Sequence, residues 1–120
     1  MIITKLEQDV IEFHKKFKIQ KQPNNPKMLH ARILHLHEEV VEYANACSKK
    51  DKSKQLDALV DLIYVALGTV YLTLSNRNFR EAWVRVHKAN LNKIRKKTNR
   101  SEWDVVKPKG WKEPDLSDLT

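Results

Sequence analysis

Cysteine, glycine and proline are scarce in this sequence of 120 residues. It has one cysteine, Cys47, together with two glycines and four prolines. A single cysteine excludes an intrachain disulfide framework and fits a reducing compartment, so we expect a cytoplasmic protein. The low glycine and proline content disfavours turn-rich β architectures and favours long helices. We therefore expect an all-α chain that folds as a single domain over residues 1–120.

The sequence also lacks the motifs of several functional classes. It contains no P-loop, no Rossmann glycine pattern and no zinc-type spacing of cysteine and histidine. No Glu-x-x-His pair occurs, which disfavours a di-iron helical bundle. The first residues show no secretory signal pattern, because charged side chains interrupt it. The uncharged run 62–74 is too short to span a bilayer, so we expect no membrane partner.

Positive charge is in excess: 23 lysines and arginines stand against 15 aspartates and glutamates, for a net charge of +8. Such an excess favours an anionic partner, which could be nucleic acid, a membrane surface or a polyphosphate. The basic residues are spread over the whole chain rather than gathered on one recognition face, which disfavours nucleic acid as the partner. The alternative function is a non-catalytic, basic helical protein that binds nucleic acid.

Apolar periodicity predicts a four-helix bundle followed by an extended C-terminal tail. The expected helices cover 5–18, 27–48, 56–74 and 79–97. The third helix is apolar nearly all round, so it should be the central element. The tail, from about residue 99, should be anchored by Trp103 and Trp111.

The second predicted helix carries an apolar seam in alternating steps of four and three residues, which predicts packing against another helix. The seam consists of Leu29, Ile33, Leu36, Val40, Tyr43 and Cys47. In the third helix, Gly68 lies on nearly the same line as Asp61. A mid-helix glycine costs about 1 kcal/mol relative to alanine, which the close approach of a neighbouring helix or a ligand would offset.

Two acidic clusters lie on these helices. Glu38, Glu39 and Glu42 fall within one arc of the second helix, and Asp57 and Asp61 are one turn apart on the third. The first cluster lies away from the middle of the seam and alone would be a solvated acidic face. The second lies in an apolar run, where acids need a partner. That partner could be a lysine or arginine of another helix, and the helix dipole could stabilise Asp57. Both clusters together favour Mg²⁺, and in a basic protein a phosphate-bearing substrate.

These segments resemble the all-α nucleoside triphosphate pyrophosphohydrolases, in the MazG-like and phosphoribosyl-ATP pyrophosphohydrolase-like group. The resemblance covers nearly the whole chain and rests on D-V-I-E-F-H at 9–14, E-E-V-V-E at 38–42, D-A-L-V-D-L-I-Y-V-A-L-G at 57–68, H-K-A-N-L-N-K at 87–93 and K-P-K-G-W-K-E-P-D-L at 107–116. It implies a MazG-like all-α fold and sites built from paired subunits. The apolar third helix, which needs more cover than one small subunit supplies, also favours a homodimer or homotetramer.

The resemblance implies Mg²⁺-dependent hydrolysis of (deoxy)nucleoside triphosphates to the monophosphate and pyrophosphate, in the housekeeping of nucleotide pools. Mn²⁺ could substitute for Mg²⁺. Glu39, Glu42 and Asp61 would hold the ion, with Glu38 and Asp57 as further ligands. Glu38 and Glu39 are the candidate catalytic carboxylates that would orient or deprotonate water.

The resemblance also implies substrate contacts and shows one departure. Asn90 and Lys93 would contact phosphate or sugar, with His87 beside them and Lys107 in the tail as further substrate-binding residues. Many MazG-type enzymes carry E-x-x-D on the third helix. Here Ala58 stands three residues before Asp61, and the acid is one residue earlier, at position 57. The number of metal ions and the role of this acid therefore stay open.

Overall fold

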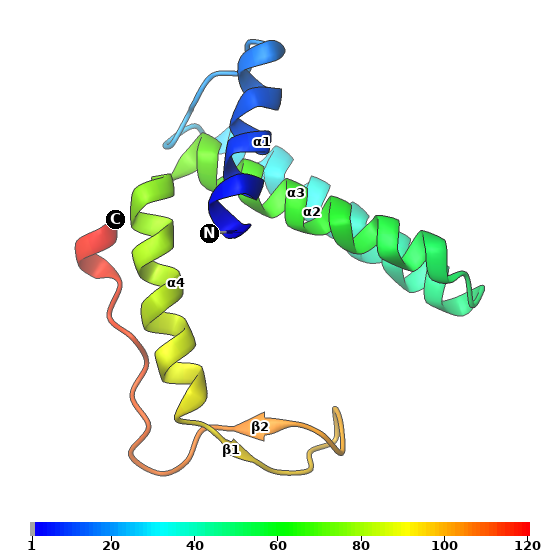
Figure 1. The fold of residues 1–120 in the computed structure, drawn as a ribbon, viewed down its shortest axis with the longest axis vertical. Coiled ribbons are helices and arrows are strands. Elements are labelled where there is room, and N and C mark those ends of the chain that lie inside the picture. Colours follow the sequence, from blue (N-terminus) through cyan, green and yellow to red (C-terminus); the bar gives the residue numbers. More distant parts are fainter. Residues whose placement is uncertain (1) are drawn as a thin grey trace. The chain divides into compact units, whose positions relative to one another are not determined.

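The computed structural model describes residues 2–120, with side chains from Thr4 onward. The described residues form four α-helices, a two-stranded sheet and a short 3-10 helix (Figure 1). These elements are α1 (Ile2–Lys16), α2 (Pro26–Ser48), α3 (Lys52–Thr73), α4 (Asn76–Leu91), β1 (Ile94–Arg95), β2 (Val105–Val106) and η1 (Ser117–Leu119). The predicted all-α, MazG-like class and its four helices are confirmed.

The chain divides into two compact units, Met1–Asn76 and Arg77–Thr120. In the first unit α3 packs against both α1 and α2, so it is the central helix of that unit, as predicted. By length and composition alone α3 is also apolar enough to cross a membrane. Because it packs between two helices and carries Asp57 and Asp61, we interpret it as a core helix. The single domain over 1–120 stays a prediction.

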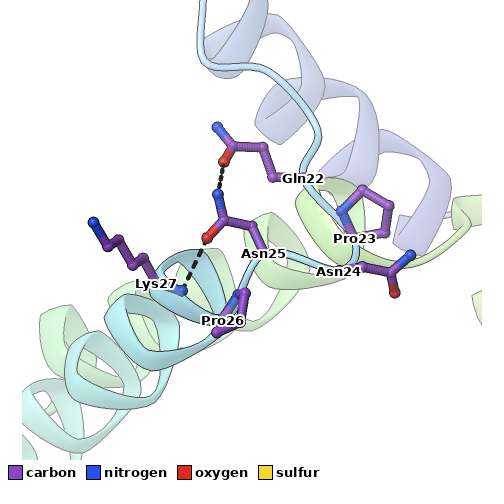
Figure 2. A pocket seen from close by; sticks show the side chains of 6 residues that line it. All are labelled: Gln22, Pro23, Asn24, Asn25, Pro26 and Lys27. Atoms are coloured by element: carbon purple, nitrogen blue, oxygen red, sulfur yellow. Dashed lines mark hydrogen bonds between the residues drawn. The ribbon is translucent and has the colours of Figure 1, made fainter.

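The start of α2 is fixed by the loop that precedes it. The Asn25 side chain accepts a hydrogen bond from the Lys27 backbone N–H at 2.9 Å and donates one to Gln22 Oε1 at 2.6 Å (Figure 2). Pro26 follows at the first helical position, where its missing N–H is not needed. A shallow hollow lies over this loop, but the six residues that line it, 22–27, include no carboxylate.

The face that α2 turns toward α3 differs from the predicted apolar seam. Glu39 and Ala46 are buried there, and Arg32 donates hydrogen bonds to α3 from the same line, one heptad before Glu39. Ile33 and Val40 of the predicted seam are 64% and 51% exposed. The small Ala46 side chain and the hydrogen-bonded Arg32 guanidinium allow α2 and α3 to pack closely along the line of Arg32, Glu39 and Ala46. Much of the predicted apolar seam therefore stays exposed in the single chain.

Gly68 lies where side chains from α1 and α2 converge on α3. A Cβ at this position would lie 3.1 Å from both Arg32 Nη2 and His14 Cε1. Both neighbours are held in place: Arg32 Nε donates to Thr69 Oγ1 at 3.0 Å, and the buried His14 donates from Nδ1 to the Val10 carbonyl at 2.7 Å. Burial lowers the pKa of Arg32. The predicted close approach at Gly68 is therefore made by neighbouring helices.

In the second unit, the prediction for the end of the fourth helix is wrong. This helix ends at Leu91 and not near residue 97, and the chain then turns into a hairpin. Strand β1 pairs with β2 in antiparallel register, with Ile94 opposite Val106. The expected extended tail is thus partly a hairpin. Trp111 does anchor the tail, because its Nε1–H donates to the Ala89 carbonyl at 2.8 Å. Trp103 does not act as an anchor, since it is largely exposed.

The last residues of the chain return along α4. Arg85 Nη1 donates to Asp118 Oδ1 at 2.6 Å, and the Asn78 side chain donates to the Leu119 carbonyl at 3.0 Å. These bonds hold η1 against α4, as Figure 1 shows for the C-terminal end of the chain. The second unit is therefore closed by polar contacts along a single helix.

Candidate functional site

Three of the five predicted metal ligands converge between α2 and α3. Glu39, Glu42 and Asp61 each offer one carboxylate oxygen, and these oxygens all lie within 4.8 Å of one another. Glu39 lies on the face that α2 turns toward α3, and Glu42 follows it by about one turn. Helix periodicity therefore brings two acids of α2 beside one of α3. The cluster lies wholly within the first unit.

Glu39 is the most buried member of this acidic cluster. Its residue is 7% exposed, and its Oε2 atom is buried with no hydrogen-bond partner among the described residues. Its other oxygen lies 3.6 Å from His35 Nε2. Burial raises the pKa of Glu39, and the charges of Glu42, Asp61 and Glu38 raise it further. An ionised Glu39 would thus be stabilised by a cation placed among these carboxylates.

The acidic cluster fits a hard divalent cation. Carboxylate oxygens are the ligands that Mg²⁺ prefers, and the unsatisfied Glu39 Oε2 is a buried lone-pair donor turned away from water. A buried acid without a hydrogen-bond donor is otherwise costly. We therefore regard the unpartnered oxygen, and not the number of acids, as the observation that favours a metal here.

The other two predicted ligands flank the acidic cluster. Glu38 is exposed on α2, and Asp57 is exposed on α3. Asp57 and Glu42 line a shared cavity of about 250 Å³. Two lysines, Lys49 and Lys54, line the same cavity. Both lie between the predicted helices 27–48 and 56–74, in a segment to which the sequence gives no functional role. Their position one or two turns from the acids was the signal that could have identified them.

The predicted substrate-binding residues lie in the second unit. Lys93 and Lys107, far apart in sequence, come together over one ring: their Nζ atoms are 5.2 Å and 5.1 Å from the Trp111 ring centroid. His87 and Asn90 are exposed on α4. The structure thus brings two of the four residues together around an aromatic side chain that sequence reasoning had treated only as an anchor.

Comparison with known proteins matches residues 10–90 to the phosphoribosyl-ATP pyrophosphohydrolase family. The match covers more than half of the chain and includes both acidic helices, whereas Lys93, Lys107 and Trp111 lie beyond it. No curated protein matches the chain. The chain therefore belongs to the phosphoribosyl-ATP pyrophosphohydrolase family, within the MazG-like all-α nucleoside triphosphate pyrophosphohydrolase superfamily, and is a hydrolase of the pyrophosphate-releasing kind that acts on nucleotides.

Proposed function

We propose that this protein hydrolyses nucleoside triphosphates, with a preference for deoxynucleotides, to the monophosphate and pyrophosphate in a Mg²⁺-dependent reaction. The observation that carries the proposal is the convergence of Glu39, Glu42 and Asp61, with one buried carboxylate oxygen unsatisfied. The family supports pyrophosphate release from a nucleotide. A role in nucleotide-pool housekeeping in the cytoplasm belongs to the same proposal.

The acids would divide the work of the reaction. Glu39, Glu42 and Asp61 would hold Mg²⁺, with Glu38 and Asp57 beside them. When bound, the ion would neutralise polyphosphate charge and lower the pKa of a bound water. Glu38 or Glu39 would orient the attacking water and accept its proton. The water oxygen would bond to the α-phosphorus while the bond from that phosphorus to the oxygen bridging the α- and β-phosphates breaks. The electron pair of the broken bond would leave with pyrophosphate.

The substrate contacts would come from the cations of the second unit. Lys93 and Lys107 carry full charges suited to phosphate oxygens, and Asn90 and His87 offer side-chain groups for hydrogen bonds to phosphate or sugar. Their shared position in one compact unit supports a common role. Neutralising Lys93 should raise KM for a nucleotide more than it lowers kcat.

A nucleotide panel assayed for both pyrophosphate and orthophosphate tests the proposed reaction. The panel should contain the common ribo- and deoxynucleoside triphosphates, each with Mg²⁺, with Mn²⁺ and with a chelator. Phosphoribosyl-ATP belongs in the panel because the description of the matched family names it. Pyrophosphate as product with metal present supports the proposal. No turnover, or orthophosphate as the sole product, contradicts it.

Nucleic-acid binding is the alternative, and one observation favours it. The hairpin is basic, and its exposed Trp103 ring lies under Arg95 at 4.3 Å, an arrangement on which a base could stack. This function predicts binding to single-stranded DNA or RNA that weakens steeply with salt and needs no divalent metal. Fluorescence anisotropy with a labelled oligonucleotide at two salt concentrations separates it from the hydrolase.

We also propose that the protein assembles as a homodimer or a dimer of dimers. Large apolar side chains on α2 and α3 are more than 40% exposed in the single chain, more than isolated surface residues explain. They are Leu29, Ile33, Leu34, Val40, Val41, Leu56, Leu59, Val60 and Ile63. A second copy that buries these side chains would remove the cost of their exposure. Light scattering that finds a stable monomer at micromolar concentration would contradict this.

A further inference from the structure

A small cavity between α2 and α3 adjoins the acidic cluster. Its volume is about 250 Å³, and Glu42 belongs both to its lining and to the acidic cluster. The cavity lies toward the turn that joins the two helices, which run side by side up to that turn (Figure 1). Two buried alanines, Ala46 of α2 and Ala58 of α3, are part of its lining. Because both side chains are small, they leave room between the longer polar side chains around them.

The cavity is lined by opposite charges that do not pair with each other. Two acids, Glu42 and Asp57, and two lysines, Lys49 and Lys54, line it. Among the residues that the structure describes, no ion pair within 4.0 Å joins either lysine to a carboxylate. Asp51, which lies between the lysines in the sequence, instead accepts a hydrogen bond from the Lys54 backbone N–H at 3.1 Å. Both ammonium groups are therefore available to an anion that enters the cavity.

The turn between the helices brings the two lysines to the same cavity. Lys49 is the C-cap of α2. Lys50 follows with a φ of 54°, a left-handed conformation that commonly ends a helix. Asp51 then caps α3, and its backbone N–H donates to the Ala46 carbonyl at 3.0 Å. Because these bonds fix the backbone on both sides of the turn, a ligand has only the side chains of Lys49 and Lys54 to order.

We propose that this cavity is a diphosphate subsite, in which Lys49 and Lys54 bind oxygens of the substrate's β- and γ-phosphates. The nucleotide origin of that diphosphate rests on the proposed function, whereas the binding of pyrophosphate does not. Pockets for whole drug-sized ligands have volumes of about 300–1,000 Å³, so this smaller cavity suits a fragment of a nucleotide. Glu42 and Asp57 would repel a bare anion, but Mg²⁺ is commonly bound through one or two carboxylates together with phosphates. Pyrophosphate should therefore bind as its Mg²⁺ complex.

The test measures pyrophosphate binding to the full chain by calorimetry in the presence of Mg²⁺. Lys49→Gln and Lys54→Gln should each weaken binding about fivefold, as expected for a charged hydrogen bond at an exposed residue. The double variant should lose about 25-fold if the two contributions add. Lys50→Gln and Lys52→Gln remove the same charge from the same turn, but neither lysine lines the cavity, so each should change binding less than about twofold. Circular dichroism checks that each variant is folded.

Two results would overturn the diphosphate subsite. Equal losses in Lys49→Gln and Lys50→Gln, or in Lys54→Gln and Lys52→Gln, would mean that the turn attracts anions through its net charge alone. The second result comes from titration with Mg²⁺ alone, because a lysine opposes a cation in the same cavity. Tighter Mg²⁺ binding by Lys54→Gln, together with undiminished pyrophosphate binding, would mean that the cavity takes a second cation instead.

Product inhibition then separates the subsite from the proposed reaction. With an active wild type, Lys54→Gln should raise the inhibition constant of pyrophosphate about fivefold and leave that of a nucleoside monophosphate within about twofold. A merely structural role predicts equal changes for both products, and that result overturns the subsite and leaves the hydrolase standing. Conversely, if wild type hydrolyses no nucleotide while pyrophosphate binding still depends on Lys49 and Lys54, the proposed reaction fails and the subsite stands.

Discussion

At the scale of single residues, the acidic cluster lowers the stability of the metal-free protein. Glu39 is buried, its Oε2 is unsatisfied, and its pKa is raised by burial and by neighbouring carboxylates. Near neutral pH such a group opposes folding unless a cation compensates it. Functional sites commonly carry a stability cost of this kind. Removing one charge from the cluster should therefore relieve the fold and end the function.

Asp61→Asn tests this because it removes one charge and keeps the shape. We expect no hydrolysis, and in chelator we expect a melting temperature no lower than that of wild type. Mg²⁺ should stabilise the folded wild type by mass action, by about 2.7 kcal/mol at a hundred times its Kd. The melting temperature of the wild type should therefore rise with Mg²⁺, and that of the variant should rise much less. Thermal melts with Mg²⁺ and with chelator provide the measurement.

The control for Asp61→Asn is Glu12→Gln, which neutralises an exposed acid of α1 outside the cluster. It should keep both the activity and the Mg²⁺-dependent rise in melting temperature. A strong loss of stability in Asp61→Asn with chelator would mean that Asp61 pairs with a buried cationic side chain. The metal assignment would then fail at its most specific residue.

The residue types at the site could be predicted from the sequence, but which of them are buried and which are exposed could not. The helical spacing of the carboxylates in the sequence is sufficient to identify all five acids. Glu39 is buried and Glu38 exposed because α2 turns its Arg32 and Ala46 line toward α3. That choice depends on hydrogen bonds from Arg32 to α3, which periodicity does not contain. The contacts of Lys93 and Lys107 with the Trp111 ring could not be predicted either, because they join residues that are distant in the sequence.

At the scale of elements, Gly68 marks the closest approach in the first unit. Gly68→Ala gains about 1 kcal/mol of helix propensity. The new Cβ meets Arg32 and His14 at 3.1 Å, and overpacking costs about 1–3 kcal/mol. We expect a net fall in the free energy of unfolding, by up to about 2 kcal/mol, measured in urea. In an Arg32→Met background the same change should cost less, and equal costs in both backgrounds would rule out this steric account.

The hairpin of the second unit should depend on pH through Asp104. Arg100, then Thr98 and the Val105 N–H, donate to this carboxylate and hold its pKa well below the usual 3.8. A lowered folded-state pKa gives stability that is present above the ordinary value and lost as pH falls through the folded one. Asp104→Asn should thus weaken the hairpin at pH 7, with a difference from wild type that shrinks below about pH 3.8.

Amide exchange at Lys96 reports the hairpin directly, because this N–H donates to the Asp104 carbonyl at 2.9 Å. Its protection, corrected for intrinsic exchange, should fall in Asp104→Asn at pH 7. Asp115→Asn, which alters an acid outside the hairpin, should leave it unchanged. Equal protection in wild type and Asp104→Asn at pH 7 would show that the carboxylate does not hold the strands together.

The helices could be predicted more reliably than their ends. All four lie close to the predicted segments because apolar periodicity is local. The end of α4 was misplaced because Ile94 continues its apolar stripe in the sequence. In the structure this residue pairs with Val106, and the Trp111 indole takes the Ala89 carbonyl near the helix end. Such distant partners leave no periodic signal.

At the scale of the whole molecule, the exposed apolar side chains of α2 and α3 imply an assembly. Val60 of α3 is 53% exposed, so a charge there should be tolerated by a single chain and not by a buried interface. Val60→Arg should therefore shift the protein toward monomer in sedimentation experiments, with secondary structure retained. Leu91→Arg places the same charge at an exposed residue of α4 and should leave assembly intact. If only Leu91→Arg dissociates the protein, the interface lies elsewhere.

The hydrogen bonds that Asn76, Asn78 and Arg85 of α4 donate also bear on the order in which the chain folds during synthesis. The first unit is complete once Asn76 has emerged, since its side chain donates to Glu7 at 3.0 Å. The second unit is different, because Arg85 and Asn78 cannot make these hydrogen bonds until Asp118 and Leu119 have been synthesised. A nascent chain stalled shortly after Asn76 should already resist protease over its first unit, while α4 becomes protected only after residue 119 appears.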